Sequence, residues 1–320
     1  MESPYQMKWT VWLRDPRFRT IFFFGIASGL PSSLVFATLS IWLREEGVSR
    51  TSIGLISAAA TPYAINFLWA PFVDRFQFGP LRQRLGQRRS WIFVCQLLLI
   101  PAIVSMGMQD PGDTALMLGI CAFAISILSA TQDVAIDAYR IEILAPHEYG
   151  AGAALAIYGW HTGAFLTGAG ALYIAAFSGW DIAYTAAGVA VGLVAVATLF
   201  AREPERPASA LAPAKNALCW LKDAAVAPIT DFFARLRWLA FLIIAVIVFY
   251  KFGDAMLGRM AGVFYVDLGF TKIEIANYTK SVGLFATLLG VGVGGWVCIR
   301  IGIMQAMFLG AALMAVTNLA

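Results

Sequence analysis

Residues 180–201 read WDIAYTAAGVAVGLVAVATLFA, and residues 202–237 continue as REPERPASALAPAKNALCWLKDAAVAPITDFFARLR. The first stretch carries a single charge, at Asp181, and is long enough to cross a bilayer, which takes about 20 mainly apolar residues in a helix. The second stretch is rich in proline and charge, so it predicts a connection outside the membrane. This boundary predicts a membrane span followed by a long polar linker.

The composition of the whole chain points the same way. Of its 320 residues, 60% are hydrophobic and 13% are charged, against roughly 25% charged in a typical soluble protein. The mean hydropathy is +0.74, and a soluble fold cannot hide that much apolar surface from water. These values exclude a disordered chain, a coiled coil, a disulfide-rich secreted domain and a soluble nucleotide-binding fold. The apolar runs are long and continuous, which excludes a transmembrane barrel and predicts an all-α polytopic membrane protein.

The apolar runs predict the organisation of the chain. We expect nine spans, at about 19–43, 52–73, 90–108, 114–138, 150–176, 180–201, 238–265, 272–299 and 303–320. Six spans, a linker and further spans are typical of a transporter built from two six-helix halves. We therefore expect a first half at 1–201, a cytoplasmic linker at 202–237 with an amphipathic interfacial helix at 217–226, and a partial second half at 238–320. The ninth span reaches residue 320 without a polar flank, so we expect this second half to be truncated.

The distribution of Lys and Arg predicts the orientation. One side of the predicted spans holds 17 of these residues and the other side holds three, namely Arg44, Arg50 and Lys272. Cytoplasmic loops carry the excess of positive charge. The N-terminus and the linker are therefore expected in the cytoplasm.

The sequence offers little support for catalysis. The four cysteines are far apart, and no metal-ligand spacing, Walker loop or Ser/His/Asp constellation is present. We expect no metal, no cofactor and no nucleic-acid partner, and we expect a lipid-embedded monomer that is not an enzyme. A membrane-embedded enzyme is kept as an alternative of another class.

The connection between the second and third predicted spans contains Asp74-Arg75 and, after an insertion, Gly86-Gln87-Arg88-Arg89. An Asp at a helix end can pair with an arginine or with a helix N-terminus and so latch two helices in one state. This pattern resembles the cytoplasmic signature loop of the major facilitator superfamily. We expect Asp74, Arg75, Gly86, Arg88 and Arg89 to form a conformational latch, with a plain positive loop as the alternative.

Further short motifs narrow the resemblance. They are GIASGLP at 25–31, FLWAP at 67–71, SATQD at 129–133, GAGAA at 150–154 and YKFGD at 250–254. In this order they resemble the muropeptide permease (AmpG-type) family of the major facilitator superfamily. The resemblance implies a permease of the bacterial inner membrane that imports anhydromuropeptides for peptidoglycan recycling. A carrier of another solute, such as acetyl-CoA or a drug, is the alternative.

Two acids in the fourth span are candidates for proton coupling. Asp133 and Asp137 are four residues apart and therefore lie on one helix face. Two close carboxylates in a low dielectric do not both ionise easily, so one of them is expected to hold a proton. This arrangement suits a proton symporter. The alternative is a structural network, because Arg140 is three residues from Asp137.

Charged residues in the seventh and eighth spans are candidates for substrate binding. Lys251 lies roughly 20 Å deep at 1.5 Å per residue, near the midplane where carrier sites lie. Lys280 lies in the next span, and both ammonium groups would balance the carboxylates of a muropeptide. Asp254 is three residues after Lys251, so a purely structural pair is the alternative.

Polar and aromatic residues elsewhere complete the predicted substrate site. His161 and Trp160 lie in the fifth span, and Tyr63 and Asn66 lie in the second. Aromatic rings stack on sugars, and amide or imidazole groups bond to them. The alternative is that these residues pack in the core or face lipid.

Overall fold

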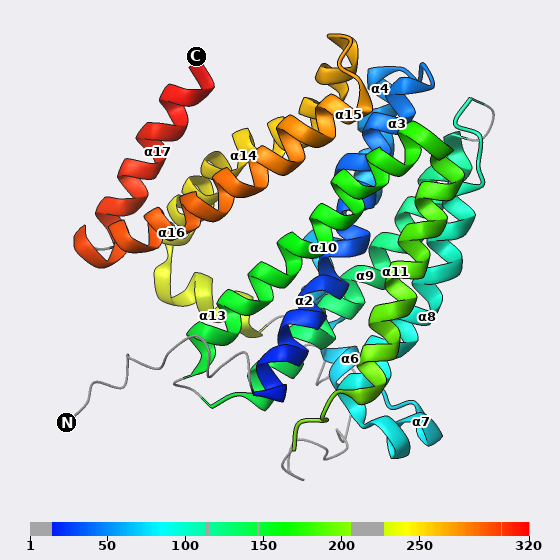
Figure 1. The fold of residues 1–320 in the computed structure, drawn as a ribbon. Helices are drawn as coiled ribbons and strands as arrows, with labels where there is room; N and C mark the ends of the chain where they lie inside the picture. Colours follow the sequence, from blue (N-terminus) through cyan, green and yellow to red (C-terminus); the bar gives the residue numbers. More distant parts are fainter. Residues whose placement is uncertain (1–14, 113–114, 146–147, 206–226, 302, 320) are drawn as a thin grey trace.

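The computed structural model describes residues 15–112, 115–145, 148–205, 227–301 and 303–319, and every regular element among them is a helix (Figure 1). Helical segments occupy each of the nine predicted spans. We call α2–α11 the N-terminal group and α13–α17 the C-terminal group.

The first span is one long helical path with a change of pitch in its middle. It consists of α2 (Pro16–Ser33), the π-helical segment η1 (Leu34–Thr38) and α3 (Leu39–Glu45). The side chain of Asp15 caps the first turn, because it accepts a hydrogen bond of 2.8 Å from the backbone N–H of Arg17.

The second span is not one continuous helix. It is divided into five pieces, which are α4 (Arg50–Ser57), η2 (Ala58–Ala60), α5 (Pro62–Ile65), η3 (Asn66–Leu68) and α6 (Ala70–Arg75). Pro62 stands at the centre of this division, where it has no N–H to donate and its ring excludes a regular helix. A short helix, α7 (Gly79–Leu85), follows in the connection to the third span.

The remaining spans of the N-terminal group are regular. They are α8 (Gln87–Gly107), α9 (Ala115–Ile143), α10 (Tyr149–Ser178) and α11 (Trp180–Phe200). Gly179 joins α10 to α11 with a φ of +95°, a conformation that glycine adopts without steric cost.

The C-terminal group begins with α13 (Ala227–Leu236), a helix within the predicted linker. It continues through α14 (Trp238–Asp267), α15 (Lys272–Glu274), η7 (Ile275–Val282), α16 (Gly283–Ile301) and α17 (Ile303–Leu319). The interfacial helix predicted at 217–226 lies outside the described residues.

Close packing of α2 against α10 organises the N-terminal group. A Cβ added at Gly29 would lie 2.1 Å from the backbone oxygen of Trp160, and one added at Gly159 would lie 2.2 Å from the oxygen of Phe22. Two hydrogen bonds reinforce the crossing: Thr167 Oγ1 donates to Leu30 O at 2.7 Å, and Thr38 Oγ1 donates to Thr167 O at 3.1 Å. Small residues therefore let these two backbones touch, as is common between membrane helices.

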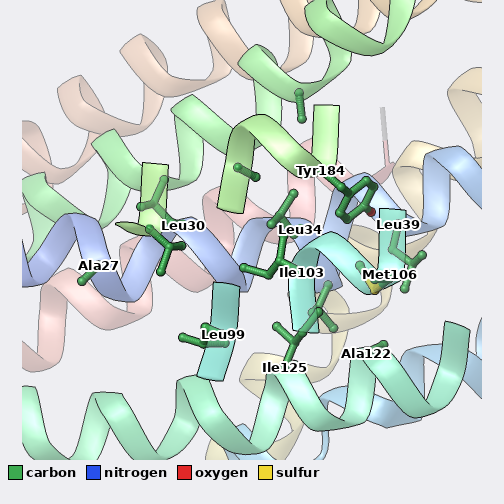
Figure 2. Close-up of a cluster of buried hydrophobic side chains, with 14 of the residues drawn as sticks. Ala27, Leu30, Leu34, Leu39, Leu99, Ile103, Met106, Ala122, Ile125 and Tyr184 are labelled. Carbon is green, nitrogen blue, oxygen red and sulfur yellow. The ribbon is translucent and has the colours of Figure 1, made fainter. Parts of the chain in front are cut away.

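The apolar core lies around the first span. Figure 2 shows Leu30 and Leu34 of this span near Leu99 and Ile103 of α8, with Tyr184 of α11 close by. All five are at most 2% exposed. Burial of such side chains fixes the arrangement of the N-terminal group.

The outer surface is apolar as well. Large side chains such as Leu116, Leu193 and Phe200 are more than two thirds exposed. Within the described residues, four helical segments are long and apolar enough to cross a membrane: Pro16–Glu45, Gln87–Gly107, Leu116–Ile143 and Trp180–Phe200. An apolar surface of this kind faces lipid, so the chain is a multi-pass membrane protein.

The two groups come together toward one end of the molecule. In Figure 1 they come together at the upper end, where α3, α4 and α15 lie, and they diverge toward the lower end, where α6 and α7 lie. The sites described next follow from this arrangement.

Candidate functional site

A cavity of about 330 Å³ lies between the two groups. The N-terminal group contributes α2, η1 and α10 to its wall, and the C-terminal group contributes α16. Its polar lining consists of two serine hydroxyls, one threonine hydroxyl, an indole and an imidazole, from Ser32, Ser33, Thr287, Trp160 and His161. A mixed lining of this kind suits a ligand with both hydroxyl groups and apolar faces.

Trp160 and His161 are the two predicted site residues that line this cavity. Their rings make an edge-to-face contact with centroids 5.0 Å apart. Trp160 is 39% exposed, so its ring is open to contact by a ligand. The backbone of α10 reaches this position because Gly29 has no side chain to collide with the Trp160 carbonyl.

Another part of the cavity wall is formed by the π-helical segment. Ser33 precedes it and Phe36 lies within it, and both line the cavity. Single π-helical turns inside α-helices occur frequently at functional sites. The irregular pitch therefore lies where a ligand contact is expected.

The two predicted coupling acids have different surroundings. Asp133 lies inside the N-terminal group, where its Oδ1 atom is buried without a hydrogen-bond partner in the described structure. Ser28 of α2 and Cys95 of α8 lie near it. The side chain of Asp137 is 63% exposed and pairs with Arg140 at 3.0 Å. The geometry thus agrees with the structural alternative for Asp137, whereas Asp133 remains a buried carboxyl without an ionic partner among the described residues.

Most of the predicted latch residues meet at the lower end of the molecule. Arg88 is 3% exposed and contacts Asp74 at 2.6 Å and Glu142 at 2.7 Å. It thereby ties α8 to the ends of α6 and α9. Arg75, at the end of α6, is exposed.

A residue beyond the sixth span completes this cluster. The carboxylate of Glu203 accepts hydrogen bonds from the backbone N–H groups of Arg88 at 2.8 Å and Arg89 at 3.1 Å, so it caps α8. Gly86 has a φ of +87°, and a Cβ there would lie 2.3 Å from the Glu203 side chain. Arg89 Nε donates in return to the Thr198 carbonyl at 3.1 Å. Burial raises the pKa of Glu203 above its ordinary value, against the opposing effect of these backbone donors.

Sequence reasoning missed Glu142 and Glu203 as latch partners. Glu203 is the first acid after the sixth span and lies next to Arg202, where the sequence carries no signal for a partner. Only its position near the start of α8, 115 residues away in the chain, identifies it as a helix cap.

Ion pairs at the upper end join the two groups. Lys272 of α15 lies 2.9 Å from Glu45 of α3, and its ammonium also stands 4.9 Å above the Trp180 ring. Trp180 Nε1 donates to the other Glu45 oxygen at 2.9 Å. This set of contacts, which we call the Glu45 cluster, was not predicted.

A second set of contacts lies beside it. Asp267 at the end of α14 forms ion pairs with Arg44 and Arg50 of the N-terminal group. Tyr173 of α10 donates a hydrogen bond to Asn277 of η7. One carboxylate from each group thus holds cations of the other group, and the contacts close the upper end of the molecule.

Several predicted residues fall outside this geometry. The side chains of Lys251, Asp254 and Lys280 lie outside the described residues, although their backbones belong to α14 and η7. Tyr63 and Asn66 do not line the described cavity. Within the described chain, no group of three or more His, Cys, Asp and Glu residues could hold a metal.

Comparison with known proteins identifies relatives of the chain. Residues 21–320 match the family described as Major Facilitator Superfamily. The transporter AmpG 4 of Rickettsia felis is 34% identical over 311 residues, which cover 96% of this chain and 73% of that protein. The anhydromuropeptide permease of Escherichia coli K12 is 34% identical over 307 residues, which cover 95% of this chain and 60% of that protein.

A solved structure has the same fold. It is a bacterial homologue of the human lysosomal transporter Spinster, in an inward-facing and unoccupied conformation. It superposes with a TM-score of 0.64 at 16% identity and covers 90% of this chain and 63% of its own.

Proposed function

The chain belongs to the major facilitator superfamily, and from this premise we propose that it is a secondary carrier that imports anhydromuropeptides. The observation that carries the proposal is the 34% identity to an anhydromuropeptide permease across 95% of this chain. The cavity is consistent with it. The Trp160 indole can stack on a sugar ring, and the hydroxyls of Ser32, Ser33 and Thr287 can bond to sugar hydroxyls.

The direct test is counterflow in proteoliposomes. Vesicles that contain the purified protein and unlabelled anhydromuropeptide should accumulate labelled anhydromuropeptide from outside, whereas vesicles without protein should not. Labelled acetyl-CoA should not exchange. Exchange of acetyl-CoA without exchange of muropeptide would assign the chain to another solute.

Proton symport through Asp133 is the second element of the proposal. The Oδ1 atom of its carboxyl is buried, and Asp133 has no ionic partner among the described residues, so binding and release of a proton changes its charge in a low dielectric. Asp133→Asn should abolish accumulation driven by an imposed pH gradient and leave exchange partly intact. Asp137→Asn is the matched control, because Asp137 is exposed and paired with Arg140. Accumulation at the wild-type level in Asp133→Asn would exclude Asp133 as the coupling acid.

On the basis of the sequence, we propose that Lys251 and Lys280 bind the carboxylates of the substrate. An unpaired ammonium inside a span costs roughly 2.5–3.5 kcal/mol, so each lysine is expected to have an anionic partner. Removal of one partner of a desolvated pair costs about 2–5 kcal/mol of binding. Lys280→Ala should therefore raise KM for peptide-bearing muropeptides far more than for the uncharged disaccharide. Lys251→Ala should be partly rescued by Asp254→Asn, and equal losses for both substrates would make Lys280 structural.

Alternating access connects these parts. The 17-to-3 charge asymmetry assigns the latch end to the cytoplasm, so the Glu45 cluster is assigned to the outer side of the inner membrane. In this orientation the contacts of Glu45 and Asp267 hold the outer side of the carrier closed. Cysteine labelling at Gln83 by an impermeant reagent in intact cells should fail, and labelling there would reverse the orientation.

A further inference from the structure

The second span is divided into short helical pieces near the buried carboxyl of Asp133. The backbone N–H groups of Thr61 and Ala64 bond to carbonyls three residues earlier, at 2.9 Å each, and so does that of Trp69, at 3.2 Å. Short 3-10 stretches inside a helix often mark a hinge. The lower end of the break is attached to α9, because Trp69 Nε1 donates a hydrogen bond to Thr131 Oγ1 at 3.1 Å.

Tyr63 lies within this break and places its hydroxyl in the interior. The hydroxyl is buried beside Asp133 and Ser129 of α9, yet it makes no hydrogen bond of standard geometry in the described structure. Ser129 Oγ and Asp133 Oδ1 are also buried without a partner. Buried polar atoms that lack partners cost free energy, so these three groups favour any arrangement that pairs them.

The ring of Tyr63 has a second contact. Its centroid lies 5.1 Å from that of Phe36 at an interplanar angle of 44°. Phe36 belongs to the π-helical segment η1 and lines the cavity. One side chain therefore contacts the wall of the cavity through its ring and approaches the candidate coupling acid through its hydroxyl.

We propose that Tyr63 is a positioning residue that links the charge of Asp133 to the position of Phe36 in the cavity wall. When Asp133 is ionised, the phenol donates to the carboxylate, because hydrogen bonds to a charged acceptor are roughly twice as strong as neutral ones. When Asp133 binds a proton, that advantage is lost and the phenol turns to Ser129. The broken second span lets the ring follow, and Phe36 moves with it. This inference rests on the proposed coupling role of Asp133.

Few other groups near Asp133 could produce the same effect. Cys95 faces it from α8, Ser28 from α2, and Asp137 lies one turn along its own helix. Asp137 is already paired with Arg140. Tyr63 is the group that approaches Asp133 from the second span and also contacts the described cavity wall.

The test is the pH profile of muropeptide uptake in proteoliposomes. Tyr63→Phe keeps the ring and its contact with Phe36 but removes the donor. The ionised form of Asp133 then loses a hydrogen-bond donor, so it binds a proton more readily. The midpoint of the uptake–pH profile should move upward by about one pH unit, which corresponds to a tenfold gain in proton affinity. KM in exchange at a fixed low pH should stay within about twofold of wild type. Tyr149→Phe, an exposed tyrosine at the start of α10, should leave the midpoint unchanged.

A second variant gives a shift of opposite sign. Ser129→Ala removes the alternative partner of the phenol, so the ionised form is favoured and the midpoint should move downward. Unchanged midpoints in Tyr63→Phe and Ser129→Ala would overturn the inference, and either variant suffices if the other is not recovered as folded protein. If Asp133→Asn itself keeps wild-type accumulation, the coupling proposal fails instead. If Asp133→Asn loses accumulation while both midpoints stay unchanged, only the role of Tyr63 is rejected.

Discussion

The ammonium of Lys272 lies 2.9 Å from a carboxylate oxygen of Glu45, and the two residues belong to the eighth and first spans. Their side chains are 19% and 37% exposed, and the Trp180 ring covers the pair on one side. Asp267 with Arg44 and Arg50 repeats the arrangement with the charges exchanged between the groups. These contacts hold the two groups together at the end where they meet.

Neutralising Glu45, the partner of Lys272, should favour the conformation in which the two groups separate at this end. A partly exposed ion pair contributes up to about 1 kcal/mol, which corresponds to roughly a fivefold change in population. Glu45→Gln should increase the reactivity of a cysteine placed at Ala276, a fully buried position of η7, toward an impermeant thiol reagent. Glu46→Gln, at the exposed neighbouring position, is the control and should react as wild type does. Equal reactivity in all three proteins would show that the pair does not bias the conformation.

Arg88 should be the most sensitive residue of the latch. Its buried guanidinium is shared by Asp74 and Glu142, and hydrogen bonds to charged groups contribute about 1.5–3 kcal/mol. Arg88→Ala should therefore lower the Tm of the detergent-purified protein sharply, and Arg88→Lys should restore it only in part because lysine lacks the planar fork. Arg84→Ala, at an exposed position of α7, should leave Tm unchanged. A similar small effect of both alanine variants would contradict the assignment of Arg88 to a structural latch.

The contact between α2 and α10 should not tolerate a single added methyl group. In Gly29→Ala the Cβ would lie 2.1 Å from the Trp160 carbonyl oxygen, a backbone atom that cannot turn away. Overpacking of this kind costs about 1–3 kcal/mol or more, and it also displaces the cavity residue Trp160. Gly54→Ala meets open space in α4 and should be neutral or stabilising by up to about 1 kcal/mol. Thermal unfolding and counterflow of both variants measure the contrast, and a functional, stable Gly29→Ala protein would show that the helices separate at little cost.

Glu203 should give the protein a specific pH dependence. Burial holds its pKa above the ordinary value of 4.5, so the folded state binds a proton more tightly than the unfolded state does. Its contribution to stability is therefore greatest below pH 4.5 and is lost as the pH rises through the folded pKa. Subtracting the Tm of Glu203→Gln from that of wild type at each pH should give a difference that decreases from about pH 4.5 toward neutrality. A difference that increases over this range would mean that the backbone donors of Arg88 and Arg89, rather than burial, determine the direction in which the pKa of Glu203 is shifted.

Much of the fold could be predicted from the sequence because the membrane imposes a local rule. A span must be long and apolar within itself, so 22 residues such as 180–201 predict α11 without knowledge of any other helix. The short motifs were equally informative, since the pattern from Asp74 to Arg89 pointed to the family. The pattern left open whether Asp74 pairs with an arginine or with a helix N-terminus, and the structure pairs it with Arg88.

The tertiary structure decided what depends on distant partners. Spans that are apolar all round carry no pattern that tells which face meets which neighbour, so the cavity position of Trp160 and His161 and the buried position of Tyr63 could not be separated in advance. For the same reason the sequence does not identify the partners of Glu203 and Lys272. Each acquires its role only when folding brings it to a group more than 100 residues away, Arg88 in one case and Glu45 in the other. Local hydropathy determines that a segment enters the membrane, and packing between helices determines which of its side chains meet.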